Sequence, residues 1–238
     1  MHDGQGESSP YHMRPLLRRV GRWVFTLGLV FLLGPIPLVL AWRIFEPPTT
    51  TMMLARTVER VLEAKRPFYP RRQSIPMARI SPHLRRAVLA AEDDRFYLHS
   101  GFDFQEIARA LDDYDRGKPL RGASTISQQT AKNLFLWEGR SFLRKGLEAY
   151  LTVILESLLP KDRILEIYLN LAEWGDGVFG AEAAAQAYFA KSAAALSRHE
   201  AAQMAAVLPN PREWEPHDGV ARRRARRILE RMAQQVER

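Results

Sequence analysis

The sequence contains no cysteine among its 238 residues. This absence excludes a disulfide-stabilised scaffold, a thiolate metal site, a cysteine nucleophile and a redox-active cysteine pair. It does not identify the compartment, because a core of sufficient size needs no disulfides even in an oxidising space. The sequence also lacks internal repeats and any alternating apolar and polar run long enough for a useful strand. These absences favour a mainly helical fold.

Basic charge is in excess only at the two ends of the chain, although the formal net charge is +8. Residues 1–43 hold five arginines and two acids, and residues 219–238 hold seven arginines and two acids. The residues between them hold 23 basic and 23 acidic side chains and are therefore neutral. A nucleic-acid-binding protein usually spreads its basic charge over a folded face. We therefore expect no nucleic-acid partner.

The composition is that of a folded protein, with 46% hydrophobic and 26% charged residues, which excludes wholesale disorder. The length suits one catalytic domain with a short appendage. We expect an N-terminal basic segment over residues 1–22, a membrane helix over 23–42, and a linker with the start of the outer domain over 43–80. The catalytic domain is then expected over residues 81–215, and an arginine-rich helix over 216–238.

Residues 23–41 contain no charged side chain, and Trp23 and Trp42 bracket the run. About 20 helical residues span about 30 Å, the thickness of a bilayer's hydrocarbon core. A cleaved signal peptide and a buried core helix are the alternatives, but no small-x-small cleavage site follows the run. Basic residues are concentrated before it and keep the N-terminus in the cytoplasm by the positive-inside rule; they are Arg14, Arg18, Arg19 and Arg22.

The remaining chain reads as linkers and helices. Residues 46–53 and 65–80 are rich in proline or irregular in pattern and are expected to be extended or irregular. A helix is expected to begin at Ser81-Pro82, because serine caps helices well and proline favours the first helical position. Further helices are predicted over 141–159, 161–171, 181–189 and 197–208. The helix over 141–159 has an apolar stripe of Leu143 and five later residues, and the helix over 197–208 opens with a Ser197–Glu200 capping box.

The first candidate chemical motif is the segment 91–103, where Glu92 and Asp93 end an apolar helix. A carboxylate beside apolar packing tends to have a raised pKa, which suits a general acid or base. The alternative is a solvated helix end at which His99 merely caps carbonyls. Acids at a helix C-terminus oppose the helix dipole, which favours a functional reason for their position.

The second motif is the run of small and amide side chains over 121–135. Such groups bind sugar hydroxyls and phosphate oxygens without adding bulk. Ser124 is expected to cap a helix, on which Gln128, Gln129 and Lys132 share part of one face. The alternative is an ordinary capped surface helix.

The third motif places Arg140, Arg144 and Glu148 four residues apart on one helix face. Residues 116–145 hold seven Lys or Arg and one acid, a local surplus inside a neutral domain. Arginine binds phosphate oxygens bidentately and lysine adds a point charge, so a phosphate or pyrophosphate site is expected here. The alternative is a ladder of ion pairs on a solvated face.

Taken together, these motifs resemble the peptidoglycan glycosyltransferase family (glycosyltransferase family 51). The likeness runs from about Ile80 to Pro211. It consists of five blocks in order: Glu92-Asp93-x-x-Phe96-x-x-His99-x-Gly101; Gly122-Ala123-Ser124-Thr125-Ile126-x-Gln128-Gln129-x-x-Lys132-Asn133-Leu134-Phe135; Arg144-Lys145-x-x-Glu148; Lys161-x-x-Ile164-Leu165-x-x-Tyr168-Leu169-Asn170; and Gly177-x-x-Gly180 with Ala183-Ala184-x-x-Ala187-Tyr188-Phe189. The chain stops where bifunctional members begin a transpeptidase domain, so it is similar to the monofunctional kind.

The resemblance implies an all-α fold, with a lysozyme-like main lobe and a smaller membrane-proximal jaw lobe, preceded by one transmembrane helix. It implies an enzyme that polymerises lipid II, with inversion and a pyrophosphate leaving group, at the bacterial inner membrane with its catalytic domain in the periplasm. The implied partners are lipid II, the growing lipid-linked glycan strand, the membrane, and other cell wall synthesis and division proteins.

The resemblance also implies roles for individual residues. Glu92 is the expected general base. Glu148 is the second expected catalytic carboxylate, which positions cations or holds a divalent metal (Mg²⁺ or Mn²⁺) against pyrophosphate. No organic cofactor is expected. The leaving-group cations are Lys132, Arg140, Arg144 and Lys145, and the expected substrate-binding residues are Asp93, Ser124, Thr125, Gln128 and Gln129.

Two other readings remain open at this point. A lysozyme-like lytic enzyme shares the fold and a key glutamate but needs no pyrophosphate clamp, and a membrane-tethered scaffold needs no active site. The arginine-rich tail is expected to lie apart from the catalytic site and to contact anionic headgroups; its arginines are Arg222, Arg223, Arg224, Arg226 and Arg227.

Overall fold

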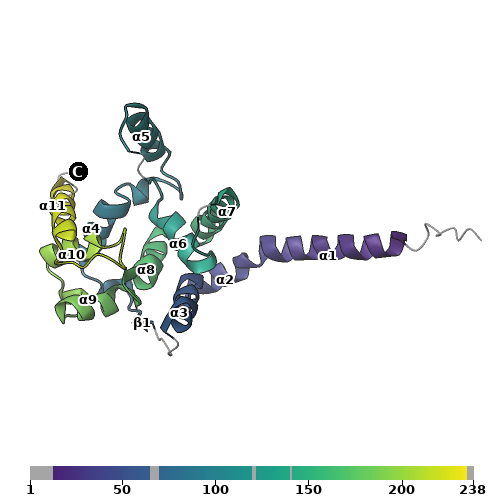
Figure 1. The fold of residues 1–238 in the computed structure, drawn as a ribbon, viewed down its shortest axis with the longest axis horizontal. Coiled ribbons are helices and arrows are strands. Elements are labelled where there is room, and N and C mark those ends of the chain that lie inside the picture. The colour runs from purple at the N-terminus through teal and green to yellow at the C-terminus, as the bar shows by residue number, and fades with distance from the viewer. Residues whose placement is uncertain (1–12, 65–69, 120–121, 140, 235–238) are drawn as a thin grey trace, which may run out of the picture.

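The computed structural model describes residues 13–64, 70–119, 122–139 and 141–234. Helices dominate it, as expected (Figure 1). The α-helices are α1 (Met13–Leu33), α2 (Pro35–Trp42), α3 (Thr51–Ala64), α4 (Pro82–Glu92), α5 (Phe104–Asp115), α6 (Ile126–Phe135), α7 (Phe142–Leu158), α8 (Lys161–Leu171), α9 (Ala181–Phe189), α10 (Arg198–Ala206) and α11 (Gly219–Gln234).

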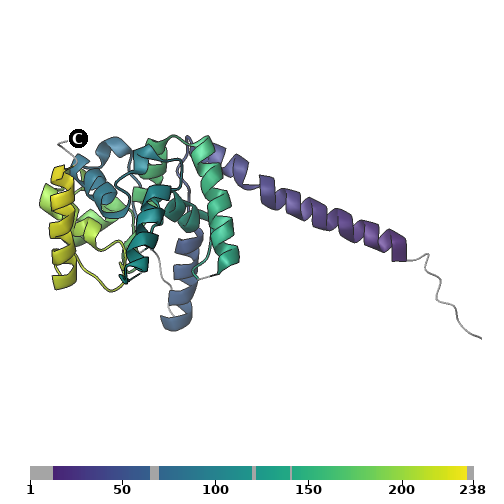
Figure 2. The same cartoon turned by 90° about the horizontal axis from the view of Figure 1, so that it is seen from above.

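Helices α1 and α2 form the apolar N-terminal arm. From Arg18 to Trp42 they make one run of 25 residues that is long and apolar enough to cross a membrane, and its most apolar 18-residue window has a mean hydropathy of 2.4. Only 6% of its most apolar window is buried, so this arm is not a core helix. Pro35 occupies the first turn of α2, where its missing N–H costs no hydrogen bond. The arm leaves the body on the side opposite α11 (Figures 1 and 2).

The prediction of an extended segment over 46–53 is wrong for its last three residues, because α3 already begins at Thr51. The hydroxyl of Thr50 accepts a hydrogen bond from the backbone N–H of Met53 at 3.0 Å and so caps the helix. Met52 and Met53 are buried in the core. The prolines precede the helix, so they do not interrupt it.

The body is built around α4, α6, α8, α9, α10 and α11. Helix α10 packs on both α4 and α11, and α6 packs on α7 and α8. The helices expected from Ser81, over 161–171 and over 181–189 are all present. The capping box expected at Ser197–Glu200 also forms, and α6 begins with another. Large buried side chains such as Trp174, Tyr168 and Phe96 fill the core.

The strands are short, in keeping with the sequence. β1 (Arg71–Arg72), β2 (Glu173–Gly175) and β3 (Val178–Phe179) form a sheet in the order β1-β3-β2. β1 pairs with β3 in parallel, and β2 pairs with β3 antiparallel. Part of the segment expected to be irregular, 65–80, therefore forms a strand and the 3₁₀ turn Met77–Arg79; residues 65–69 lie outside the described residues.

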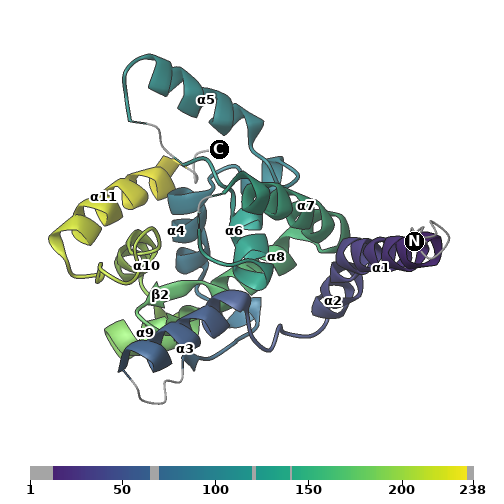
Figure 3. The same ribbon diagram turned by 45° about the vertical axis from the view of Figure 1, so that its right-hand side comes forward.

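Two features of the edge of the domain were not anticipated. Helix α5 has no counterpart among the expected helices and stands off the body (Figures 1 and 3). Its Phe104, Leu111 and Tyr114 are exposed. Leu143, expected in the apolar stripe of α7, is 72% exposed because the first turn of α7 extends past the core, which α7 reaches from Leu147 onward.

Candidate active site

Glu92 is the last residue of α4 and lines a cleft of about 620 Å³. The cleft lies between the end of α4, α5, residues 122–125 and the end of α11. The side chain of Glu92 is 12% exposed and both of its oxygens are engaged. Gln129 of α6 donates its amide N–H to Oε2 at 3.0 Å, and Arg224 of α11 donates to Oε1 at 3.0 Å. The carboxylate is therefore held in one orientation at the cleft wall.

Asp93 follows directly and also lines the cleft, but its carboxylate is engaged by other groups of the protein. It is buried, and its Oδ2 accepts the backbone N–H of Ile126, the first residue of α6, at 3.0 Å. His99 Nε2 lies 3.0 Å from Oδ1 of the same carboxylate. Asp93 thus joins the end of α4 to the start of α6, next to Glu92. The expectation that Asp93 contacts substrate stays a prediction, and the contacts seen here give it a positioning role.

The start of α6 is capped by Thr125 and not, as expected, by Ser124. The Thr125 hydroxyl accepts the N–H of Gln128, and the Gln128 side chain accepts the N–H of Thr125 at 3.0 Å, which completes a capping box. Gln128 is therefore buried and occupied by the cap. Ser124 instead accepts a hydrogen bond from Lys145 Nζ at 3.2 Å. Ser124 and Thr125 both line the cleft.

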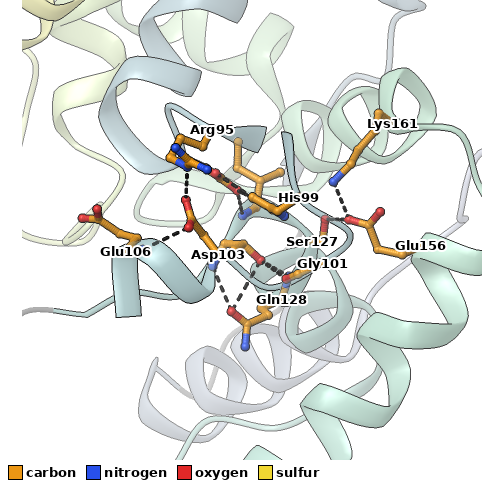
Figure 4. Close-up of polar contacts among 12 residues, drawn as sticks. Arg95, His99, Gly101, Asp103, Glu106, Ser127, Gln128, Glu156 and Lys161 are labelled. Carbon is orange, nitrogen blue, oxygen red and sulfur yellow. Dashed lines mark hydrogen bonds and ion pairs between the residues drawn. The ribbon is translucent and has the colours of Figure 1, made fainter. Parts of the chain in front are cut away.

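The loop between α4 and α5 is held on α6 by a polar network (Figure 4). Thr125 donates its hydroxyl to the carbonyl of Gly101 at 2.6 Å, and Arg95 pairs with Asp103 at 3.1 Å. Gly101 has φ +90°, and a Cβ there would lie 2.9 Å from Thr152 Cγ2, so both conformation and space require glycine. Asp103 also caps α5 by accepting the N–H of Glu106 at 2.9 Å.

A second part of the same network secures the other side of α6. Ser127 donates to Glu156, which also pairs with Lys161 at 2.7 Å (Figure 4). Lys161 lies 4.4 Å from the centre of the Phe96 ring. The loop, α6, α7 and α8 are in this way locked together behind the cleft.

Gln129 is oriented by Tyr168 of α8. The Tyr168 hydroxyl donates to Gln129 Oε1 at 3.1 Å, which turns the amide nitrogen toward Glu92. Burial, and then the carboxylates of Glu92 and Asp93, raise the pKa of Tyr168 well above its ordinary value. The phenol therefore stays protonated at neutral pH and remains a donor.

Glu148 lies on α7 among cations, as the spacing predicts. It is 3% exposed; Arg144 pairs with its Oε2 at 2.8 Å, and Lys145 pairs with its Oε1. Lys145 also reaches Ser124, so this cluster meets the cleft wall. The Arg144 side chain is 11% exposed and that of Lys145 47% exposed.

Lys132 of α6 belongs to the same cluster. Burial lowers the pKa of Lys132, while the nearby Glu148 raises it and Arg144 lowers it further. Three cations thus surround one buried carboxylate, and the cluster has a positive surplus. Such a surplus in a partly buried place suits an anionic ligand rich in oxygen. Arg140, expected to be a fourth cation, lies outside the described residues.

The residues expected to bind a metal already have partners. Both Glu148 oxygens are paired with cations, and the described residues contain no group of three or more His, Asp or Glu side chains placed to hold a metal ion. The donor set near Glu148 therefore does not fit a metal held by this chain alone. A divalent metal at Glu148 stays a prediction from the family resemblance.

The expectation that the arginine-rich tail lies apart from this site is wrong. Helix α11 packs on α4, and Arg224 contacts Glu92 directly. The other four arginines of that group are exposed. Since α11 lies at the end of the body opposite the α1 arm, its arginines also do not adjoin the arm (Figures 1 and 2).

Sequence reasoning missed Arg224 and Tyr168 as site residues. Tyr168 falls within an apolar helix face, and its one distinguishing signal is a polar tip at a buried position. Arg224 sits within a run of arginines, and nothing local separates it from its neighbours. Its contact joins residues 132 positions apart, which only the tertiary structure reveals.

Comparisons with known proteins agree with this picture. A family model described as "Transglycosylase" matches residues 59–233, a range that includes α4, α6, α7 and nearly all of α11. The "Biosynthetic peptidoglycan transglycosylase" of Ectopseudomonas mendocina is 50% identical over 224 residues, which cover 93% of this chain and 90% of the relative. Relatives of the same name from Xanthomonas oryzae pv. oryzae (47% identical; 93% of this chain, 91% of the relative) and Chromohalobacter salexigens (51% identical; 84% and 86%) are similar. The chain thus belongs to the transglycosylase family.

Proposed function

We propose that this protein is a membrane-anchored peptidoglycan glycosyltransferase that polymerises lipid II into glycan strands. Family membership and the names of relatives that cover most of the chain support a biosynthetic transglycosylase. The substrates are then lipid II and the growing lipid-linked strand. The observation that carries the proposal is that one helix, α6, carries both Gln129, which holds the carboxylate of Glu92, and Lys132, which belongs to the cation cluster around Glu148.

Glu92 is placed to act as the general base. It takes the proton from the 4-hydroxyl of the acceptor sugar, and that oxygen attacks the anomeric carbon of the donor. A new β-1,4 bond forms as the bond between the anomeric carbon and the lipid pyrophosphate breaks, with inversion at that carbon. Because Glu92 is held by Gln129 and Arg224, no reorientation of the base is needed as the acceptor arrives.

The leaving pyrophosphate carries the negative charge that develops in the reaction. Lys132, Arg144 and Lys145 supply fixed positive charge for it, and Arg140 is expected to join them. Glu148 holds Arg144 and Lys145 in place and prevents their mutual repulsion from spreading the cluster. Ser124, tied to Lys145, is the link between this cluster and the cleft that Glu92 lines.

A divalent metal, if bound with substrate, would add Lewis-acid stabilisation of the pyrophosphate. Glu148 is the residue of this chain that would approach it. Because its oxygens are paired with Arg144 and Lys145, these cations fill the role of charge neutralisation in the present geometry. Comparing rates in Mg²⁺, in Mn²⁺ and in chelator measures the metal's share directly.

The lytic alternative is less well supported. Cleavage of finished glycan requires an acid and a water-activating or nucleophilic carboxylate, and no charged leaving group. The buried cation cluster would then have no use. The relatives named above are, in addition, biosynthetic by name.

We further propose that the anchor spans the bacterial inner membrane once, with the catalytic domain in the periplasm. The apolar run from Arg18 to Trp42 is followed closely only by Arg43, whereas four arginines lie in or before its start. That asymmetry places the N-terminus in the cytoplasm. Other cell wall synthesis and division proteins stay an expectation for its partners.

The test uses the full chain in detergent micelles. Lipid II is supplied in one reaction and finished, lipid-free glycan in another, and products are separated by length. Strand growth from lipid II without shortening of finished glycan is expected. Glu92→Gln should be inactive, whereas Glu63→Gln, which changes an exposed acid on α3, should be active. Shortening of finished glycan would identify a lytic enzyme, and inactivity toward both substrates would favour a scaffold.

A further inference from the structure

We propose that Arg224, on the C-terminal helix α11, is a positioning residue for the base Glu92. This inference rests on the proposed function, since it assigns Arg224 a part in the same reaction. Arg224 Nη2 lies 3.0 Å from Glu92 Oε1 and 3.4 Å from the carbonyl oxygen of Ala91. One guanidinium therefore fixes both the carboxylate and the backbone that carries it.

The contact stabilises the negative charge of Glu92 at an electrostatically unfavourable position. Glu92 is the last residue of α4, where the negative end of the helix dipole disfavours a second negative charge. Arg224 places a positive charge at that end and satisfies a carbonyl that the helix leaves open. Arg231, two turns further along α11, donates to the carbonyl of Ala90 at 3.1 Å. Two arginines of one helix thus cap the end of another.

Arg224 is distinguished from its neighbours by burial and by the docking of its helix. Its side chain is 27% exposed, whereas Arg223 and Arg227 on the same helix are exposed. The adjoining face of α11 is anchored in the core by Ala221, Ala225, Ile228 and Met232. The guanidinium is therefore held by a packed helix and is not a mobile surface charge.

The two donors on Glu92 divide the work of orientation. Gln129 holds Oε2 from α6, and Arg224 holds Oε1 from α11, so rotation of the carboxylate would break one contact or both. Each oxygen retains a lone pair for the proton of the acceptor hydroxyl. Loss of Arg224 leaves untouched the cations near Glu148 that bind the pyrophosphate of the glycosyl donor. The defect should therefore appear in kcat and not in donor KM.

The experiment compares Arg224→Gln, Arg224→Lys and the matched control Arg227→Gln in the full chain, with lipid II as substrate. Arg224→Gln should lower kcat between about tenfold and a hundredfold, as small misplacements of catalytic groups do, with donor KM within about twofold. Arg224→Lys should recover part of the rate, because both contacts run through a single nitrogen. Arg227→Gln should match the wild type.

A second comparison separates positioning from a merely structural role. In Glu92→Asp the shorter side chain withdraws the carboxylate from Arg224. Adding Arg224→Gln to that variant should therefore lower kcat by a much smaller factor than it does in the wild type. An equal cost in both backgrounds would overturn the proposal, as would wild-type kcat in Arg224→Gln. If Arg224→Gln melts far below the wild type, Arg224→Lys in the two backgrounds decides by the same criterion. Failure of the proposed function looks different: the wild type would not extend lipid II, or Glu92→Gln would do so at full rate.

Discussion

The hydroxyl of Tyr168 donates to Oε1 of Gln129 at 3.1 Å, and this bond decides which end of the Gln129 amide faces Glu92. A free amide turns easily, and with its oxygen toward Glu92 it would repel the carboxylate. Since Tyr168 is 2% exposed and its oxygen can donate only while protonated, burial of the phenol is part of the orientation of the base. A residue outside the cleft lining thus bears on the group inside it.

Tyr168→Phe should lower kcat about threefold to tenfold, because it removes one neutral hydrogen bond worth roughly 1 kcal/mol. Steady-state rates on lipid II measure the effect. Since burial raises the pKa of Tyr168, the wild-type phenol stays protonated throughout the range of activity. The ratio of wild-type to variant rates should therefore be constant between about pH 6 and pH 9. A ratio that changes steeply in that range would contradict the proposed donor role.

Glu92→Gln should reduce polymerisation by at least a hundredfold, the usual worth of a general base being 10²- to 10⁴-fold. An amide also has one acceptor where the carboxylate has two, so either Gln129 or Arg224 loses its partner. Precursor affinity should change little, because the cations near Glu148 are untouched. Rates and lipid II binding are measured on the same preparation. Near wild-type polymerisation would refute the base assignment and make Asp93 and Asp94 the next candidates.

Glu148→Gln should behave differently, with a residual rate and a donor KM raised about tenfold or more. Replacing the carboxylate leaves Arg144 and Lys145 facing an amide N–H on one side, and a lost charged hydrogen bond is worth roughly 1.5–3 kcal/mol. A lower melting temperature is also expected, since both charges of the Arg144 pair are largely buried. Thermal unfolding and KM are the measurements. An unchanged KM would separate Glu148 from the donor cluster.

Lys132→Arg should extend activity toward alkaline pH. Burial lowers the pKa of Lys132, so this side chain loses its proton at a lower pH than an ordinary lysine does. Donor binding that depends on its charge should then weaken as pH rises through that lowered value. Arginine stays charged throughout. Profiles of kcat/KM against pH for both proteins test this, and coincident alkaline limbs would show that Lys132 does not supply the charge.

Local patterns in the sequence predicted most of the helices. Proline after serine marks the start of α4, and the bounds of α8 and α9 follow from apolar spacing between clear end signals. α5 was missed although Phe104, Ile107, Leu111 and Tyr114 follow a helical spacing and Asp103 caps its start; three of these four side chains are nevertheless exposed in the structure. The whole of α3 was missed, because the prolines before it dominate the local signal and the cap that begins it is the single hydroxyl of Thr50.

The candidate site was predicted unevenly for the same reason. The motifs brought forward Glu92, Gln129 and the cluster around Glu148, and the structure brings all of them next to α6. They did not reveal that Gln128 is used by the helix cap or that the Asp93 carboxylate is engaged by Ile126 and His99. Spacing shows which side chains share a helix face, but only packing between helices decides which of them reach the cleft.

The contact between α11 and α4 also has a consequence for the order in which the enzyme matures. A ribosome makes Glu92 132 residues before it makes Arg224. At the usual pace of synthesis, about 5–20 residues per second, that interval lasts about 7 to 26 seconds. Gln129 follows Glu92 by 37 residues, so from that point until α11 is made the Glu92 carboxylate has only one of its two hydrogen-bond donors. Arrival of the C-terminal helix is then the event that completes the active site.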